Sequence, residues 1–191
     1  MSNAKILAFS GSCRAGSLND KLLQQACQAA IDTGAEVTHI NLGDYPLPIY
    51  GQDVEEQGFP ENATKLKELF KQHSALLLAC PEYNSSITPL LKNTIDWVSR
   101  PGGDSGPLEA FADKTACLIA ASPGALGGLR GLRHVREILS NIRVLVVPNR
   151  FALTSAAKAF GGDGSLADEK QAERLKSCVK SFVSTANNQA S

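Results

Sequence analysis

The chain has 191 residues, of which 43% are hydrophobic, and its 19 lysines and arginines balance its 19 aspartates and glutamates. This length and composition are typical of one globular domain with an ample core. Because the net charge is zero, the composition gives no electrostatic reason to expect a nucleic acid or an anionic membrane as a partner. No apolar run approaches the ~20 residues of a membrane span.

Apolar runs of strand length alternate with helix-like segments along the chain. Strands are predicted at 5–9, 37–42, 75–80, 115–121 and 144–147, and helices from about residues 18, 60, 89 and 129 and after a turn at 161–164. Because the strands are mostly apolar throughout, they are typical of a parallel sheet with helices on both faces. We therefore expect an α/β fold in a single domain over residues 1–191. Exposed loops are predicted at 44–51 and 101–107.

The first strand leads into a loop of small and polar residues, 10–19, that ends at a helix. Ser17 is expected to cap this helix, and its spacing from Asp20 matches a capping box. Free N–H groups at a helix start, hydroxyl groups and the Arg14 guanidinium suit a phosphate monoester. The loop lacks the Lys-Ser/Thr pair of a P-loop and the G-x-G-x-x-G spacing, so a terminal phosphate held without a metal fits better. The equally weighted alternative is a plain helix cap beside a solvated arginine.

A second polar loop follows the buried strand 75–80 and runs to the helix that starts near Pro89. Thr88 predicts that start, because threonine caps helices and proline suits the first helical position. Ligands of open α/β sheets bind at the carboxyl ends of the strands, where this loop is expected to lie. The sequence therefore predicts that this loop forms part of a binding site.

Within the second loop, Tyr83 has the shape to lie against a flat ring, and Glu82 and Asn84 have polar groups for the ring's edge. The alternative is a tyrosine packed in the core and an asparagine that makes a turn. A third loop, 122–128, follows the fourth strand and is rich in glycine. Its glycines either let the main chain approach a ligand or only form a turn before the next helix.

Together these loops resemble the NADPH-dependent FMN reductase family, which includes flavin, quinone, chromate and azo-dye reductases. The matching residues are Gly11-Ser12-x-Arg14-x-x-Ser17-x-Asn19, Pro81-Glu82-Tyr83-Asn84-x-Ser86-x-x-x-Leu91-Lys92-Asn93-x-Ile95-Asp96-Trp97-x-Ser99-Arg100, the segment 122–131 and Asp163-Gly164-x-Leu166-x-Asp168. The resemblance extends from the first strand to the last helix. Its second motif is long enough to be specific, whereas the first is moderately specific by itself.

The resemblance implies a flavodoxin-like fold, a three-layer sandwich with five parallel strands in the order 2-1-3-4-5 and FMN across the carboxyl edge of the sheet. The residues that would hold FMN are Ser12, Arg14, Ser17 and Asn19 at the phosphate, Pro81, Glu82, Tyr83, Asn84, Ser85 and Ser86 along the isoalloxazine ring, and Ser122 and Gly124 at its border. No catalytic side chain in the strict sense and no metal ligand are expected.

The resemblance also implies a reaction. NADPH, with NADH as an alternative, would pass a hydride to flavin N5, and the reduced flavin would pass electrons to a small-molecule acceptor. A quinone, free flavin, an azo dye and chromate are the candidates. The cofactor carries such chemistry, while the protein supplies binding and orientation. Family members commonly form dimers or tetramers, so a homodimer or homotetramer is expected.

Several other residues allow two interpretations. Arg130, Arg133 and Arg136 recur on the fourth helix, where they would form a solvated face, or else a subunit contact or a site for the NADPH 2′-phosphate. Cys13, in the first loop, is either a thiol with a lowered pKa or a small space-filling residue. The five cysteines are scattered without a C-x-x-C pair and the three histidines fit no metal spacing. This pattern favours the reducing cytoplasm and argues against a zinc site, and the chain's start lacks a signal-peptide pattern.

Two functions compete with the reductase. A flavodoxin-type electron carrier would bind the same cofactor, but such carriers usually have a strongly acidic surface, and this chain is neutral. An FMN-binding regulatory protein would turn over slowly with every acceptor and would bind its partner according to the redox state of the flavin.

Overall fold

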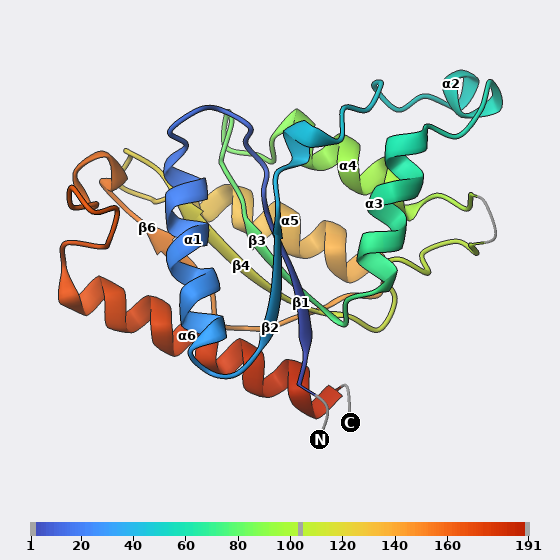
Figure 1. Cartoon of the computed structure of the whole chain (residues 1–191). Coiled ribbons are helices and arrows are strands. Elements are labelled where there is room, and N and C mark those ends of the chain that lie inside the picture. Colours follow the sequence, from blue (N-terminus) through green and yellow to red (C-terminus); the bar gives the residue numbers. More distant parts are fainter. Residues whose placement is uncertain (1–2, 103–104, 190–191) are drawn as a thin grey trace.

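The computed structural model describes residues 3–102 and 105–189, and Figure 1 shows one sheet with helices on both sides of it. The elements in chain order are β1 (Lys5–Ser10), α1 (Leu18–Ile31), β2 (Glu36–Ile40), η1 (Leu42–Asp44), α2 (Gln52–Glu56), α3 (Glu61–Lys71), β3 (Ala75–Ala79), α4 (Pro89–Ser99), β4 (Thr115–Ala121), α5 (Leu129–Asn141), β5 (Leu145–Val146), β6 (Phe151–Leu153), η2 (Ala156–Lys158) and α6 (Glu169–Gln189). Part of the predicted loop 101–107 lies outside the described residues.

The strand order is β2-β1-β3-β4-β5 and every pair is parallel, which confirms the flavodoxin-like arrangement. The predicted fifth strand, 144–147, was wrong in one respect, because the outer strand has two pieces. β5 pairs with the first residues of β4, and β6 pairs with the last three. Pro148 stands between the pieces, where its missing N–H cannot continue the ladder of hydrogen bonds.

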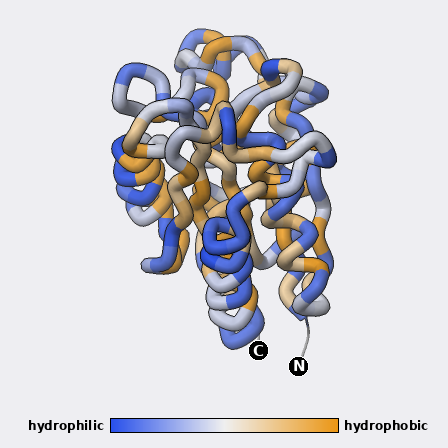
Figure 2. The backbone as a smooth tube through the Cα atoms, turned by 90° about the vertical axis from the view of Figure 1, so that its left-hand side faces the viewer, coloured by the Kyte–Doolittle hydropathy of each residue, from blue (hydrophilic) through white to orange (hydrophobic). Residues whose placement is uncertain are grey.

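Alternate residues of each strand face opposite layers. In β1, Ile6 and Ala8 belong to the core formed with α1 and α6, whereas Leu7 and Phe9 belong to the core formed with α3, α4 and α5. The continuous apolar runs of the strands therefore follow from burial on both faces. Figure 2 shows hydrophilic and hydrophobic residues recurring along the helical coils, as expected of helices that cover a core with one side.

The predicted loop 44–51 is confirmed for residues 45–51, which form neither helix nor strand, whereas Asp44 ends η1. This loop is bonded to α4. Trp97 Nε1 and Asn93 Nδ2 of α4 both donate to the Pro48 carbonyl, at 2.8 and 2.9 Å. The following helix, α2, was missed because it has only five residues and no buried face. Its Glu55 carboxylate accepts from the Tyr50 hydroxyl at 2.9 Å and from Arg100 Nε at 3.0 Å, which lowers the pKa of that carboxyl.

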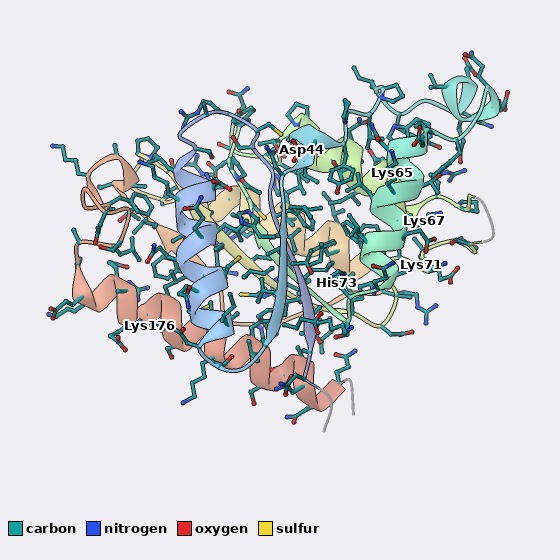
Figure 3. All side chains as sticks on the ribbon, in the orientation of Figure 1. Asp44, Lys65, Lys67, Lys71, His73 and Lys176 are labelled. Atoms are coloured by element: carbon teal, nitrogen blue, oxygen red, sulfur yellow. The ribbon has the colours of Figure 1, made fainter. Side chains whose placement is uncertain are left out.

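The amino edge of the sheet is closed by side chains that bind the backbone. The buried Lys114 ammonium donates to the His73 carbonyl. The His73 ring donates through Nδ1 to the Leu69 carbonyl (2.6 Å) and contacts Thr38 Oγ1 through Nε2 (2.8 Å). Burial lowers the pKa of Lys114 to about 8. Figure 3 labels His73 near the lower end of the sheet and Asp44 among the loops at the opposite end.

The last turn of α6 fastens the same edge. Gln189 accepts from the Thr115 hydroxyl at 2.7 Å and donates to the Asp113 carbonyl at 3.0 Å. Asn187 Oδ1 accepts from the Ala4 backbone N–H at 2.8 Å. Figure 1 shows the start of β1 and the end of α6 near each other at this edge, far from the loops at the top of the view.

Candidate functional site

Three loops meet at the carboxyl edge of the sheet, at the top of Figure 1. We name them the first loop (11–17, after β1), the second loop (81–88, after β3) and the third loop (122–128, after β4). Thr88 Oγ1 donates to the Gly11 carbonyl at 2.8 Å, which ties the second loop to the first. Thr88 also caps α4, with Pro89 at the first helical position, which confirms the predicted helix start.

Asn19 ties the first loop to the third. Its Nδ2 donates to the Ala121 carbonyl and its Oδ1 accepts from the Ala121 N–H, both at 2.9 Å. The side chain is buried. Asn19 is predicted at a bound phosphate, and in the structure its two hydrogen bonds hold the start of α1 against the end of β4. Asn19 therefore contributes to the site by placing the first loop beside the third.

The first loop is a tight turn before α1. The Ser17 N–H donates to the Arg14 carbonyl at 3.1 Å, and Gly16 adopts φ 67°, a conformation that favours glycine. Ser17 Oγ accepts from the Asp20 N–H at 3.5 Å, so the predicted cap is confirmed. The reciprocal half of a capping box is not formed, because the Ser17 N–H is already used in the turn.

A cleft of about 440 Å³ lies beside this loop, lined by Ser12, Cys13, Arg14, Ala15, Gly16, Asp20, His39, Ile40, Asn41 and Asp44. Within the described residues, the N–H groups of Cys13, Ala15 and Gly16 have no hydrogen-bond partner. The exposed Arg14 guanidinium stands among them, bonded to the Ala15 carbonyl at 3.2 Å. Free donors and a cation at a helix start suit an anion.

The pKa of the Cys13 thiol in this cleft is raised, not lowered. Partial burial raises the pKa of its thiol, and the neighbouring Asp44 carboxylate raises it further. The possibility of a lowered pKa, considered from the sequence, is therefore wrong. The carboxylates of Asp20 and Asp44 also give the cleft charge of both signs, with His39 Nε2 3.4 Å from Asp20 Oδ1.

The second loop contains a turn with an unusual backbone. Tyr83 and Ser86 exchange two N–H···O bonds of 3.0 and 2.9 Å, and Asn84 and Ser85 between them adopt φ 49° and 67°. Two positive φ values define a type I′ turn, which asparagine tolerates better than serine. Tyr83 is 54% exposed, so it is not the core tyrosine of the alternative interpretation. Asn84 does make a turn, as that interpretation held.

Three side-chain contacts fasten the second loop to α5. Glu82 Oε2 accepts from the Gly131 N–H at 2.9 Å, so its carboxylate caps the helix start. Arg130 Nη1 donates to Ser85 Oγ at 2.8 Å. Ser86 Oγ lies 2.9 Å from Nδ1 of His134. The carboxylate expected at a ring edge is thus engaged by α5, whereas the side chains of Tyr83 and Asn84 are exposed.

Sequence reasoning missed the roles of two of these α5 residues. Arg130 was weighed as a solvated group or a subunit contact, and His134 was given no role, yet both contact the second loop. Arg136 binds the Val146 and Val147 carbonyls, so it closes the end of β5. Of the three arginines only Arg133 fits a simple solvated face. No local pattern distinguishes these roles, because the partners lie far along the chain.

The glycines of the third loop differ in how much space surrounds their Cα atoms. A Cβ on Gly127 would come within 2.9 Å of the Ala152 backbone, and one on Gly128 within 2.8 Å of Ala120 Cβ. These two glycines are needed for packing inside the chain. Gly124 has no such need, since its nearest neighbour would be Ser122 Oγ at 3.5 Å. Space beside Gly124 and Ser122 is therefore open for a ligand.

Two further findings limit the chemistry. Among residues 3–102 and 105–189, no three or more His, Cys, Asp and Glu side chains gather as a metal ion would need. In the same part of the chain, no helix is long and apolar enough to cross a membrane. The geometry instead brings together an anion cradle, an exposed tyrosine and a polar turn at one sheet edge.

Comparisons with known proteins agree with this geometry. Residues 4–158 match the family of NADPH-dependent FMN reductases. The chain is 36% identical over 174 residues to an NAD(P)H-dependent FMN reductase of Pseudomonas aeruginosa, covering 90% of this chain and 89% of that protein. It is 34% identical over 189 residues to an NAD(P)H:quinone oxidoreductase of Solanum tuberosum, covering 95% and 92%.

A solved structure also resembles this chain. The flavoenzyme NAD(P)H:(acceptor) oxidoreductase FerB of Paracoccus denitrificans superimposes with a TM-score of 0.83 at 30% identity, over 97% of this chain and 98% of that chain. On sequence and structure alike, the chain belongs to the NADPH-dependent FMN reductase family.

Proposed function

We propose that this oxidoreductase, which uses FMN and NAD(P)H, passes the electrons to a quinone. The observation that carries the flavin site is the cradle of unpartnered N–H groups at Cys13, Ala15 and Gly16 beside Arg14, which suits the phosphate of FMN. Bound FMN would supply the redox chemistry, by accepting a hydride from NAD(P)H and giving up two electrons to the acceptor. The quinone assignment is supported by the 34% identity to the potato quinone oxidoreductase.

The first loop would hold the phosphate. Arg14 and the hydroxyl groups of Ser12 and Ser17 add donors to the backbone cradle, and the start of α1 adds a partial positive charge. Ser12 Oγ already accepts from the Arg14 N–H at 3.3 Å, which leaves its own hydrogen free for an anion. Asn19 would act by fixing the first loop against β4, where it bonds Ala121.

The second loop would hold the flavin ring. Tyr83 offers an exposed aromatic face, and Asn84 offers an amide on a backbone fixed by the type I′ turn. Pro81, Glu82, Ser85 and Ser86 would shape this support, three of them through contacts to α5. Ser122 and Gly124 would border the ring from the third loop. The chain's residues would bind and orient the reactants, with no side chain as the acid, base or nucleophile.

We also propose that copies of the chain associate as a dimer or tetramer in the cytoplasm. Ile49 supports association, because this large apolar side chain is 86% exposed in a segment held rigidly against α4. Light scattering of the wild type and of Ile49→Asp would test it. A monomeric wild type would contradict association. The cytoplasmic location is supported by five cysteines that are all free thiols.

Comparing FMN with riboflavin tests the phosphate site directly, because riboflavin lacks the phosphate. Arg14→Ala should weaken FMN binding by roughly tenfold, the loss expected for a charge-assisted hydrogen bond, and leave riboflavin binding unchanged. Arg133→Ala, at an exposed position on α5, is the matched control and should change neither. Fluorescence titration gives both affinities. If Arg14→Ala weakened the binding of FMN and of riboflavin equally, the proposal that the first loop binds the phosphate would be contradicted.

The ring site and the reaction need separate tests. Tyr83→Ala should weaken the binding of FMN and of riboflavin alike, and Asn84→Ala should change the flavin affinity or reduction potential. Unchanged affinities and an unchanged potential would contradict the roles proposed for these two residues.

Anaerobic mixing of FMN-loaded protein with NADPH should bleach the flavin band, and a quinone should restore it. If free flavin or an azo dye restores the flavin band faster than a quinone does, that compound would replace the quinone as the proposed acceptor. Failure of NADPH to reduce bound FMN would favour an electron carrier.

A further inference from the structure

A pair of cysteines lies inside the molecule, away from the three loops. Cys117 in β4 and Cys178 in α6 place their sulfur atoms 3.9 Å apart, within the core between the sheet and α6. Cys117 is fully buried, whereas Cys178 keeps 7% of its surface exposed. The other three cysteines have no sulfur partner in the described part of the chain. The pair therefore contains one shielded thiol and one that reaches an opening.

That opening is a groove of about 460 Å³ between the β5–β6 connection and α6, and Cys178 is part of its wall. Its charged lining residues are Arg150 and Arg174, and no carboxylate lines it. Arg174 lies over the Phe151 ring, 5.9 Å from its centroid. A cationic surrounding favours a thiolate and its oxidised forms over the neutral thiol.

We propose that Cys178 is an oxidation site for hydroperoxides and that Cys117 resolves it, closing a disulfide between β4 and α6. Exposure assigns the reacting and resolving roles, because Cys178 lines the groove whereas Cys117 is fully buried. The hydrogen bond between the two sulfur atoms also lowers the pKa of the Cys178 thiol. The break in the outer strand at 148–150 matters here, because that connection forms one wall of the groove.

The reaction balances in two steps. The Cys178 thiolate attacks one oxygen of the hydroperoxide, the O–O bond breaks, and an alcohol or water leaves after protonation while the sulfur becomes a sulfenic acid. Cys117 then attacks the Cys178 sulfur, the S–O bond breaks, and the leaving hydroxide takes the Cys117 proton as water. Two thiols lose two electrons and the hydroperoxide gains them. Disulfide sulfurs are about 2 Å apart, so closure requires the side chains to rotate.

Mass mapping of the wild type tests the proposal without any mutation. Hydrogen peroxide added to the folded protein should produce a peptide pair linked through Cys117 and Cys178. The number of thiols that can be titrated after unfolding should fall by two from the initial five, and a thiol reductant should restore all five. The oxidised protein should also melt at a higher temperature, because the link closes a separation of 61 residues. A link that forms only after unfolding in urea would overturn the proposal.

Variants separate the two roles. In Cys117→Ser, Cys178 should be trapped as a sulfenic acid and labelled by dimedone, and Cys178→Ser should give no label at Cys117. Cys80→Ser is the matched control, since Cys80 is fully buried directly after β3, bonds the Leu78 carbonyl and should not affect the link. A label at the exposed Cys13, with Cys117 and Cys178 left reduced, would also overturn the proposal. None of these readouts depends on bound FMN or on turnover.

Discussion

The two edges of the sheet are both fastened by buried side chains that bind backbone groups, but they leave different surfaces. At the amino edge the fasteners are Lys114, His73 and the end of α6, and their polar groups are used within the chain. At the carboxyl edge Asn19 and Thr88 fix the loops, while three N–H groups of the first loop stay without partners. Both edges are thus held by buried hydrogen bonds, but only the carboxyl edge keeps backbone N–H groups that a ligand could bind.

The fasteners also differ in charge. An amide or a hydroxyl is buried at the carboxyl edge at little cost once it is hydrogen-bonded, whereas the buried ammonium of Lys114 loses much of its hydration. That loss is why the pKa of Lys114 falls to about 8. The stability of the amino edge should therefore depend on pH, and that of the carboxyl edge on the geometry of neutral hydrogen bonds.

The largest effect is expected from Asn19→Ala. It leaves the N–H and the carbonyl of Ala121 buried without partners, which should cost about 3 kcal/mol of unfolding free energy. FMN affinity should fall as well, because the start of α1 would lose its position. Urea denaturation measures the cost, and Asn149→Ala, which removes an exposed hydrogen bond to the Ser181 hydroxyl, is the control. Equal small losses in both variants would show that the carboxyl edge does not rely on Asn19.

The next effect is the pH dependence of the amino edge. The unfolded chain holds the Lys114 proton up to its ordinary pKa of 10.5, but the folded protein releases it near 8. Between these values the unfolded state binds more protons, so a rise in pH stabilises the folded state. The unfolding free energy of the wild type minus that of Lys114→Met should therefore increase by about 2 kcal/mol across this range.

The control for that measurement is Lys5→Met, since Lys5 lies at the same edge with 56% of its side chain exposed. Its difference from the wild type should stay flat over the same pH range. A flat curve for Lys114→Met would mean that the buried ammonium is hydrated in solution, and the contrast in charge between the two edges would disappear.

Thr88→Val should have a smaller effect at the carboxyl edge. It removes both the cap of α4 and the bond to the Gly11 carbonyl, with an expected loss of about 1.5 kcal/mol. Thr94→Val is a matched control on the same helix, because the buried Thr94 hydroxyl bonds only the local Leu90 carbonyl. Thermal unfolding of the pair gives the difference. Similar losses would show that the link between the first two loops contributes nothing.

The smallest effect is expected from Glu82→Gln. The amide keeps an acceptor for the Gly131 N–H but loses the negative charge at the start of α5, which should cost about 0.7 kcal/mol. High salt should reduce this difference, since it screens the interaction of a charge with a helix end. A loss that salt does not change would mean that shape, not charge, joins the second loop to α5.

The sequence was a good guide to everything local. Apolar runs located β1, β3 and β4, and the Thr88-Pro89 pair located the start of α4. β6 escaped notice because it has three residues and follows Pro148, and it becomes a strand only by pairing with β4. Short elements that depend on a distant partner carry no periodic pattern of their own.

The site was predictable to the level of its loops but not of its contacts. The resemblance brought the three loops together correctly, yet the partner of Asn19 is 102 positions away and that of Glu82 is 49 positions away. Residue type alone does not separate a side chain that touches a ligand from one that holds the loop. Tyr83 and Asn84 remain candidates for the first kind because they are exposed on a fixed turn.

The broken outer strand has a consequence for how copies of the chain meet. Unpaired strand edges invite pairing with another molecule and hence aggregation. On one side of this sheet the edge consists of pieces of two and three residues, separated by a proline, so a neighbouring chain finds no continuous ladder to extend. On the other side β2 presents the exposed polar residues Glu36 and His39. Both edges of the sheet therefore disfavour the strand pairing that leads to aggregation.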